Sequence, residues 1–215
     1  MKSKREQLDE LNEYWKEHCT CELKATATQA VFGDGNAEAD VVFIGEAPGK
    51  NEDLEGRPFI GAAGKFLEEM LEGIGMKRRS SKDGERHDFA KSDIYITNIV
   101  KYRPPNNRDP EPEEKAACNE WLINELKIIH PKLIVFLGRH SMTRFFPTEK
   151  ISDIHGKLLI KNTAELGRMH FLPLYHPAAA LYNGAMRETL QKDFNKIPKA
   201  LIKITEENKI PSAAA

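Results

Sequence analysis

Hydrophobic residues along the chain gather in four short runs that are separated by longer, more polar stretches. The runs are 41–45 (VVFIG), 94–98 (IYITN), 133–138 (LIVFLG) and 171–176 (FLPLYH). All four are rich in β-branched or aromatic residues and are bounded by turn formers, which is typical of buried strands. We therefore predict one strand at each run.

Apolar side chains recur at helical spacing in three other stretches. These predicted helices cover residues 4–17, 63–74 and 112–129. The third begins with Pro112 and two acidic residues, which suits the start of a helix. Strands that alternate with helices favour the α/β class. We predict a three-layer α/β/α sandwich around a central four-stranded, mainly parallel sheet.

Length and composition add limits to this fold. The 215 residues are 40% apolar and 30% charged, and we interpret them as one domain, 1–215. No apolar run approaches the ~20 residues that span a bilayer, and the N-terminus lacks the apolar core of a signal peptide, so we expect a cytoplasmic protein. Residues 77–92 are predicted to form an exposed loop, and 211–215 a tail outside the fold.

The net charge of −1 gives the whole molecule no attraction for nucleic acid, so binding a polyanion would need a local basic surface. Residues 77–82 (KRRSSK) and 101–108 (KYRPPNNR) are the candidates, although charge runs are more often solvated faces. The three cysteines are too few for a disulfide framework, which leaves free thiols or metal ligands.

Polar residues follow three of the predicted strands. Glu46 comes after the first, Asn98 ends the second and His176 ends the last. Because ligands of parallel sheets bind beyond the carboxyl ends of the strands, these side chains are predicted to meet in one pocket. Neither a Walker phosphate loop nor a dinucleotide fingerprint is present at 45–50 or 59–66. An acid, an amide, a histidine and the aromatic Phe59 suit recognition of a flat heterocycle.

Three segments closely resemble the uracil-DNA glycosylase superfamily, specifically its family four, the thermostable bacterial and archaeal type. They are GEAPGKNEDLEGRPFIGAAGKFLEEML (45–71), YITNIVKYRPPNNRDPEPEE (95–114) and HPAAAL (176–181), and the resemblance extends from about residue 18 to about 195. It implies removal of uracil from DNA by hydrolysis of the N-glycosidic bond, after the nucleotide has been flipped out of the helix.

The resemblance assigns roles to individual residues. Glu46 would orient the attacking water, and His176 would donate to uracil O2 as negative charge builds there. Asn98 would read the Watson–Crick edge and Phe59 would stack on the base, while Ala47 stands where some superfamily members carry a catalytic Asp. The residues implied to bind the base are Gly45, Ala47, Phe59, Asn98 and His176. Those implied to contact DNA are Gly61, Gly64, Lys101, Arg103, Arg108, Ala180 and Leu181.

Each of these roles has a structural alternative. Glu46 could accept loop amides, Asn98 could cap a turn, His176 could be a structural histidine and Phe59 could belong to the core. The resemblance also leaves open a glycosylase with a shifted base range, such as hypoxanthine or xanthine, and a DNA-damage-binding module without catalysis. We expect uracil-containing DNA as the partner, no membrane association and a monomer.

The chain departs from the family at its cysteines. Family-four enzymes usually hold a four-iron four-sulfur cluster with four cysteines, of which Cys21 and Cys118 match two positions. His18 and Tyr102 stand at the other two, with Cys19 one place out of register. Such a cluster normally requires four sulfurs, so no cofactor is expected; a zinc site that uses His18, Cys19 or Cys21 and Cys118 is the alternative.

A second departure lies in the family's wedge region, which usually reads HPAALLR. Ala180 replaces the first leucine and Tyr182 the arginine, so Leu181 is expected to be the wedge.

Overall fold

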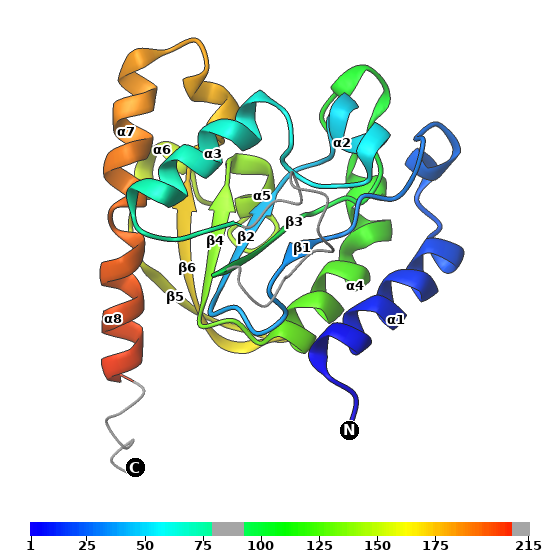
Figure 1. Ribbon diagram of the computed structural model, residues 1–215, viewed down its shortest axis with the longest axis horizontal. Coiled ribbons are helices and arrows are strands. Elements are labelled where there is room, and N and C mark those ends of the chain that lie inside the picture. The colour runs from blue at the N-terminus through cyan, green and yellow to red at the C-terminus, as the bar shows by residue number, and fades with distance from the viewer. Residues whose placement is uncertain (79–92, 208–215) are drawn as a thin grey trace.

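The four predicted strands form the centre of a six-stranded sheet in the computed structural model, which describes residues 1–78 and 93–207 (Figure 1). In sheet order the strands are β1 (Asp34–Gly35), β3 (Ile94–Asn98), β2 (Val41–Gly45), β4 (Leu133–Leu137), β6 (Gly167–Leu174) and β5 (Leu159–Thr163). The four inner strands are parallel, and the two edge strands are antiparallel to their neighbours. The α/β class and the mainly parallel sheet are confirmed, but the predicted count of four strands is wrong.

Both strands that the sequence analysis missed lie at the edges of the sheet. β1 has only two residues, and β5 alternates between partly buried and exposed positions that include Lys161 and Asn162. The inner strands β2, β3 and β4 are buried at every position. A search for continuous apolar runs therefore finds inner strands, because only they are covered on both faces.

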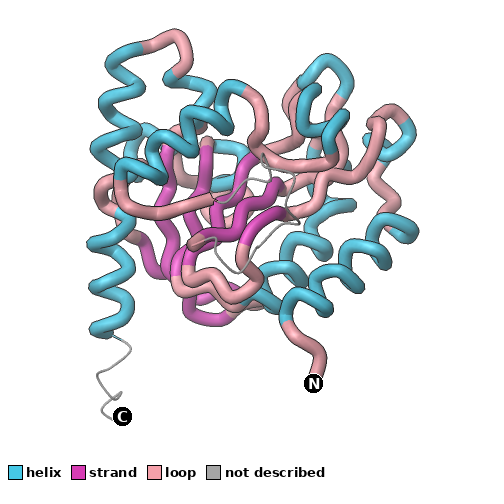
Figure 2. Tube along the Cα trace, in the orientation of Figure 1, coloured by secondary structure: helices cyan, strands magenta, loops and turns pink. Residues whose placement is uncertain are grey.

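Helices cover both faces of the sheet, as Figures 1 and 2 show. On β2, Val42 and Ile44 belong to a core cluster with residues of α1 and α4, whereas Val41 and Phe43 pack with residues of α3, α7 and α8. The helices are α1 (Lys4–His18), α2 (Lys50–Glu55), α3 (Ala62–Gly73), α4 (Pro112–Ile129), α5 (Arg139–Thr143), α6 (Ile151–Ile154), α7 (Gly184–Phe194) and α8 (Ile197–Glu207). The 3-10 helices are η1 (Glu22–Ala25), η3 (Pro105–Asn107) and η4 (Pro177–Ala180).

The three predicted helices are present within one residue of their expected bounds, as α1, α3 and α4. Local caps explain this agreement: Ser3 and Glu6 form a capping box at α1, and Glu111 and Glu114 form one at α4. Pro112 occupies the first position of α4, where its missing amide hydrogen costs nothing. Helices α7 and α8 were not predicted, although each buries an apolar face.

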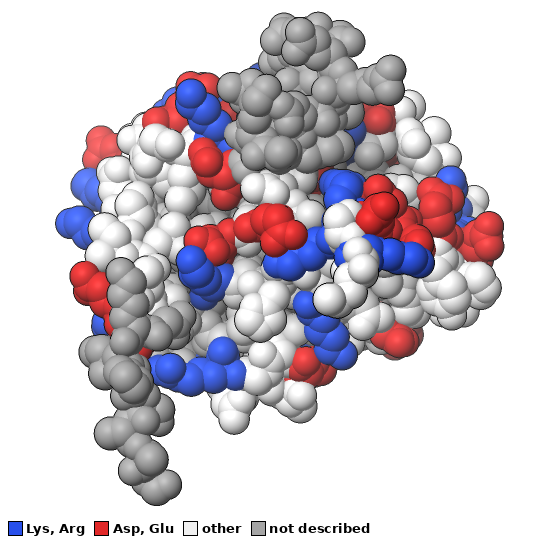
Figure 3. All heavy atoms as spheres, turned by 60° about the horizontal axis from the view of Figure 1, so that its bottom comes forward, with Lys and Arg blue, Asp and Glu red and all other residues white. Residues whose placement is uncertain are grey.

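The surface carries charges of both signs. On the face in Figure 3, Lys and Arg are interspersed with Asp and Glu rather than gathered in one basic area, in line with the net charge of −1. None of the helices in residues 1–78 and 93–207 combines the length and apolar composition that crossing a membrane requires. Residues 79–92 of the predicted loop and the predicted tail 211–215 lie outside the described residues.

Candidate active site

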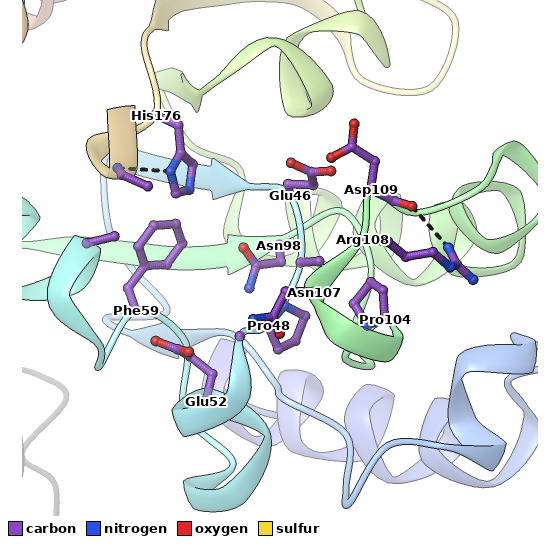
Figure 4. Close-up of a pocket in the computed structure, with 14 residues that line it drawn as sticks. Glu46, Pro48, Glu52, Phe59, Asn98, Pro104, Asn107, Arg108, Asp109 and His176 are labelled. Atoms are coloured by element: carbon purple, nitrogen blue, oxygen red, sulfur yellow. Dashed lines mark hydrogen bonds between the residues drawn. The ribbon is translucent and has the colours of Figure 1, made fainter. Parts of the chain in front are cut away.

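A cavity of about 350 Å³ opens at the carboxyl ends of the parallel strands, where the sequence analysis placed a pocket. Arg108, a predicted DNA contact, is one of the lining residues. Five residues predicted to bind the base or act in catalysis also line the cavity: Glu46, Ala47, Phe59, Asn98 and His176, all but Ala47 labelled in Figure 4. These residues come from three strand ends and one loop. The predicted convergence is therefore present.

Gly45 is the residue that lets the amide and the ring approach each other. It ends β2 opposite Asn98 in the register with β3. A Cβ atom at this position would lie 2.4 Å from Asn98 Oδ1 and 2.5 Å from the Phe59 ring, closer than real Cβ contacts. The tight packing of Asn98 and Phe59 therefore requires glycine at this position.

Phe59 is held in the cavity wall by a strained turn. Its φ of 54° lies in the left-handed region that side chains rarely adopt. The Arg78 side chain is buried and donates from Nη1 to the Phe59 carbonyl at 2.7 Å, and it also donates to the Pro58 carbonyl. The Phe59 ring lies 5.7 Å from the His176 ring, centroid to centroid. Arg78 belongs to the predicted basic run 77–82, yet it supports the loop from inside.

The start of α3 packs closely against the turn at Phe59. Gly64 is buried, and a Cβ atom there would lie 1.8 Å from the Phe59 carbonyl oxygen, so close packing requires glycine at this position. The contact between DNA and the backbone of this segment stays a prediction. Gly61 is partly exposed, but its amide donates to Glu52 Oε1 at 2.8 Å. The carboxylate of Glu52 thus occupies a helix start that was expected to bind a phosphate.

Asn98 offers an unpaired amide oxygen inside the pocket. Its side chain is 2% exposed, and Oδ1 is buried without a hydrogen-bond partner among the described residues. A buried unsatisfied polar atom costs about 1–3 kcal/mol. A ligand with a correctly placed donor would therefore recover this free energy on binding.

His176 presents a hydrogen-bond donor beside Phe59. Its Nδ1 accepts from the Ala178 amide at 3.1 Å, so the proton of the neutral ring sits on Nε2. Burial, with a smaller effect of His140, lowers the pKa of His176 to about 4. The ring is consequently neutral at physiological pH and donates through Nε2.

Glu46 is the acid of the pocket, and its surroundings favour the protonated form. Burial and the nearby carboxylate of Asp109 raise the pKa of Glu46 to about 7, while Lys115 and Arg139 act in the opposite direction. Its Oε1 is buried and has no hydrogen-bond partner within the described ranges. A carboxylate with this pKa changes its protonation near neutrality, as a general base does.

Asp109 and His140 were missed by the sequence analysis, although both lie beside Glu46. His140 Nδ1 is 3.7 Å from Glu46 Oε1, and His140 Nε2 is 3.1 Å from Asp109 Oδ2. His140 follows β4, the neighbour of β2, so the fourth strand end also carries polar chemistry. Donor atoms of the three residues lie within 4.8 Å of one another, a spacing at which they could share a metal ion.

The predicted DNA contacts fall into two groups. Lys101 and Ala180 are buried, at 0% and 3% exposure, so these two assignments are wrong. Arg103 and Arg108 reach the surface: Arg103 donates to Asn107 Oδ1 at 2.7 Å, and Arg108 lines the cavity while it pairs with Glu114. Leu181 is partly buried against the apolar core.

The cysteines form a separate buried group on the α4 side of the sheet. Cys19 Sγ donates to the Ala117 carbonyl at 4.0 Å and Cys21 Sγ to the Glu114 carbonyl at 3.7 Å, both on the helix that carries Cys118. Tyr102 Oη is buried without a partner among the described residues. His18 is exposed and stacks on Tyr14, so its predicted role as a metal ligand is wrong.

Three thiols and a phenol do not fit the four-thiolate set of a four-iron four-sulfur cluster. The chain contains only three cysteines, and the phenol of Tyr102 is a poor ligand for soft iron.

Comparison with known proteins finds one family and several similar enzymes. A model of the uracil DNA glycosylase superfamily matches residues 32–201. The chain is similar to a type-4 uracil-DNA glycosylase of Saccharolobus solfataricus, with 43% identity over 84% of this chain and 80% of that protein. Type-4 enzymes of Sulfurisphaera tokodaii and Archaeoglobus fulgidus are 45% and 44% identical, over 85% and 82% of this chain and 79% and 84% of their own lengths.

Proposed function

Because this chain belongs to the uracil-DNA glycosylase superfamily, we propose that it removes uracil from DNA by hydrolysing the N-glycosidic bond and leaves an abasic site. The observation that carries the proposal at the level of the site is the buried, unpaired Oδ1 of Asn98 beside the neutral donor of His176. A flipped pyrimidine supplies partners for both, and the cavity of about 350 Å³ has room for one base.

Asn98 selects the base. The N3 hydrogen of uracil is a donor that suits Asn98 Oδ1, and uracil O4 is an acceptor that suits the amide nitrogen. Cytosine presents the reverse pattern, an acceptor at N3 and a donor at N4, so it would leave the buried amide oxygen unpaired. A bidentate amide contact of this kind discriminates between bases by about 1–3 kcal/mol.

His176 and Glu46 divide the chemistry between the base and the sugar. As the C1′–N1 bond breaks, its electron pair passes to the base, and the Nε2 hydrogen of His176 stabilises the negative charge on O2. The Glu46 carboxylate orients a water molecule toward C1′, stabilises the positive charge on the sugar and accepts a proton as the water adds. The Phe59 ring stacks on the base and keeps it in this position.

The function is tested by cleavage of labelled oligonucleotides that carry uracil, hypoxanthine, xanthine or cytosine at one position. We expect an abasic product from uracil and none from cytosine. The matched variant Asn98→Asp is expected to lose preference for uracil over cytosine, because an ionised carboxylate offers only acceptors and lacks the amide's donor. Binding to uracil-containing DNA without cleavage of any base would support a damage-binding module instead, and preferential cleavage of a purine would support the shifted base range.

A further inference from the structure

Tyr182 is the most exposed aromatic side chain among the described residues, and it lies four positions after Ala178, which lines the pocket. Its relative exposure is 97%. It follows η4, whose Ala178 lines the cavity, and precedes α7, so the loop 181–183 stands on the edge of the molecule where the strands end (Figure 1).

The rest of this loop is anchored to the protein. Pro177 and Ala180 are buried, and Leu181 is partly buried against the apolar core that includes residues of α3 and α7. Asn183 Oδ1 accepts from the Met186 amide at 3.1 Å and caps α7. Tyr182 is therefore held between two fixed neighbours with its ring directed into solvent.

A nucleotide that is turned into the pocket leaves a gap in the base stack next to the entrance. The side chain that fills such a gap must project from the pocket's rim, make few contacts with its own protein and present an apolar surface to the neighbouring bases. Tyr182 meets all three conditions, and its flat ring can stack on any base. Leu181 does not, because its side chain already contributes to the core.

We propose that Tyr182, rather than Leu181, enters the base stack of double-stranded DNA and fills the space of the flipped nucleotide. The proposal rests on the function proposed above, since a stack-filling side chain is needed only if a nucleotide is flipped. It replaces the wedge that the sequence pattern suggested, because exposure of the side chain rather than alignment of the motif decides which residue can reach the DNA.

The test compares Tyr182→Ala with the wild type on a uracil-containing duplex and on the same uracil strand alone, at protein concentrations below saturation. We expect roughly a tenfold or larger loss of second-order cleavage rate on the duplex, as for loss of one aromatic stacking contact. Cleavage of the single strand should change by less than about twofold, since no intact stack needs to be held open there.

Two controls separate this role from others. Tyr182→Phe retains the ring and should keep most of the duplex activity. Tyr14→Ala removes another exposed tyrosine, at 54% exposure on α1, and should leave the cleavage rates of both substrates unchanged. A fluorescent 2-aminopurine placed next to a non-cleavable uridine analogue should report weaker unstacking with Tyr182→Ala than with the wild type.

Equal losses on duplex and single strand would overturn the proposal, because they would mark Tyr182 as a general DNA contact. Unchanged duplex cleavage by Tyr182→Ala would overturn it as well. A larger duplex-specific loss in a folded Leu181→Ala variant would return the role to Leu181. If the wild type cleaves neither uracil substrate, the proposed function fails first, and this outcome is distinguishable from the others.

Discussion

Two groups of buried polar atoms meet near the end of β3 and differ in whether they are paired. In the pocket, Glu46 Oε1 and Asn98 Oδ1 have no hydrogen-bond partner among the described residues. Three residues beyond Asn98, Lys101 Nζ pairs with Glu125 Oε2 at 2.5 Å and donates to the Asn98 carbonyl at 3.1 Å. Both groups are withdrawn from water, but only the second is satisfied from within the protein.

The difference distinguishes pocket atoms that are open to a ligand from paired atoms that support the fold. The Lys101 network also includes Thr97 and Tyr95, whose hydroxyl groups donate to Glu125, and it closes around the end of β3. A buried charge is tolerated only when it is paired, so this network holds the strand that carries Asn98. The unpaired pocket atoms cost stability in the free protein, and a ligand or water must satisfy them.

The largest expected effect is on the cleavage rate, when the Glu46 carboxylate of the pocket is replaced and the fold is kept. Glu46→Gln should lower the single-turnover cleavage rate by roughly 10²- to 10⁴-fold, the usual range for loss of a general base. Its thermal stability above pH 7 should be equal to or higher than that of the wild type, because an unpaired buried charge is replaced by a neutral amide. Rapid-quench cleavage and thermal unfolding of the same samples provide the measurement.

Binding of Glu46→Gln to uracil-containing DNA should stay near that of the wild type, which separates a defect in chemistry from one in recognition. An unchanged cleavage rate would show that another residue activates the water.

The second expected effect is a loss of stability when the paired group around Lys101 and Glu125 is disrupted. Lys101→Met leaves Glu125 as an uncompensated buried charge and should lower the free energy of unfolding by about 3–5 kcal/mol. The double variant Lys101→Met with Glu125→Leu should recover much of this loss, because both charges are removed together. Denaturant unfolding measures both variants.

The surface pair of Lys132 and Asp40, at 2.7 Å, supplies the matched control for this experiment. Lys132→Met should cost at most about 1 kcal/mol, since exposed ion pairs contribute little. Weaker DNA binding by Lys101→Met without any loss of stability would instead support the DNA contact that burial argues against.

The smallest expected effect is a shift in the pH dependence of cleavage, through the pKa of Glu46. Cleavage needs the Glu46 carboxylate, so the wild-type rate should fall as pH decreases through about 7, where burial and Asp109 have placed this pKa. Asp109→Asn removes a negative charge and should lower the pKa of Glu46, which moves the acid limb of the rate profile to lower pH. Lys115, Arg139 and His140 face the same carboxylate and remain in both proteins.

The profile should be recorded as second-order rate against pH, because this quantity reports the free protein. Asp109→Glu keeps the charge and should leave the limb near its wild-type position. An acid limb that stays in place in Asp109→Asn would mean that Glu46 does not control the profile.

Sequence pattern located the central part of the site because strand ends are a local feature. Glu46, Asn98 and His176 each adjoin a strongly apolar run, and parallel strands bring such ends together in any sheet of this class. Asp109 and His140 were missed for different reasons. Asp109 lies in the η3 to α4 segment, and His140 in a short helix whose approach to Glu46 depends on β4 being the neighbour of β2.

Charge and motif position did not show which side chains of the predicted DNA contacts are buried. Lys101 is part of a basic run, yet the path of the chain after β3 turns it toward Glu125 on α4. Ala180 and Leu181 occupy motif positions next to Tyr182, but Ala180 is buried and Leu181 is partly buried against the apolar core. The sequence alone does not show which of these three adjacent side chains faces solvent, because periodicity gives no guide where the backbone leaves regular secondary structure.

The sequence by itself determined the α/β class, the inner strands, three helices and the residues at the strand ends, because periodicity and apolar runs reflect burial that neighbouring residues share. Tertiary structure decided the edge strands, the partners of Glu46, the burial of Lys101 and the exposure of Tyr182. These features depend on contacts between segments far apart in the chain, and such contacts arise only when the sheet order and the packing of helices against it are set.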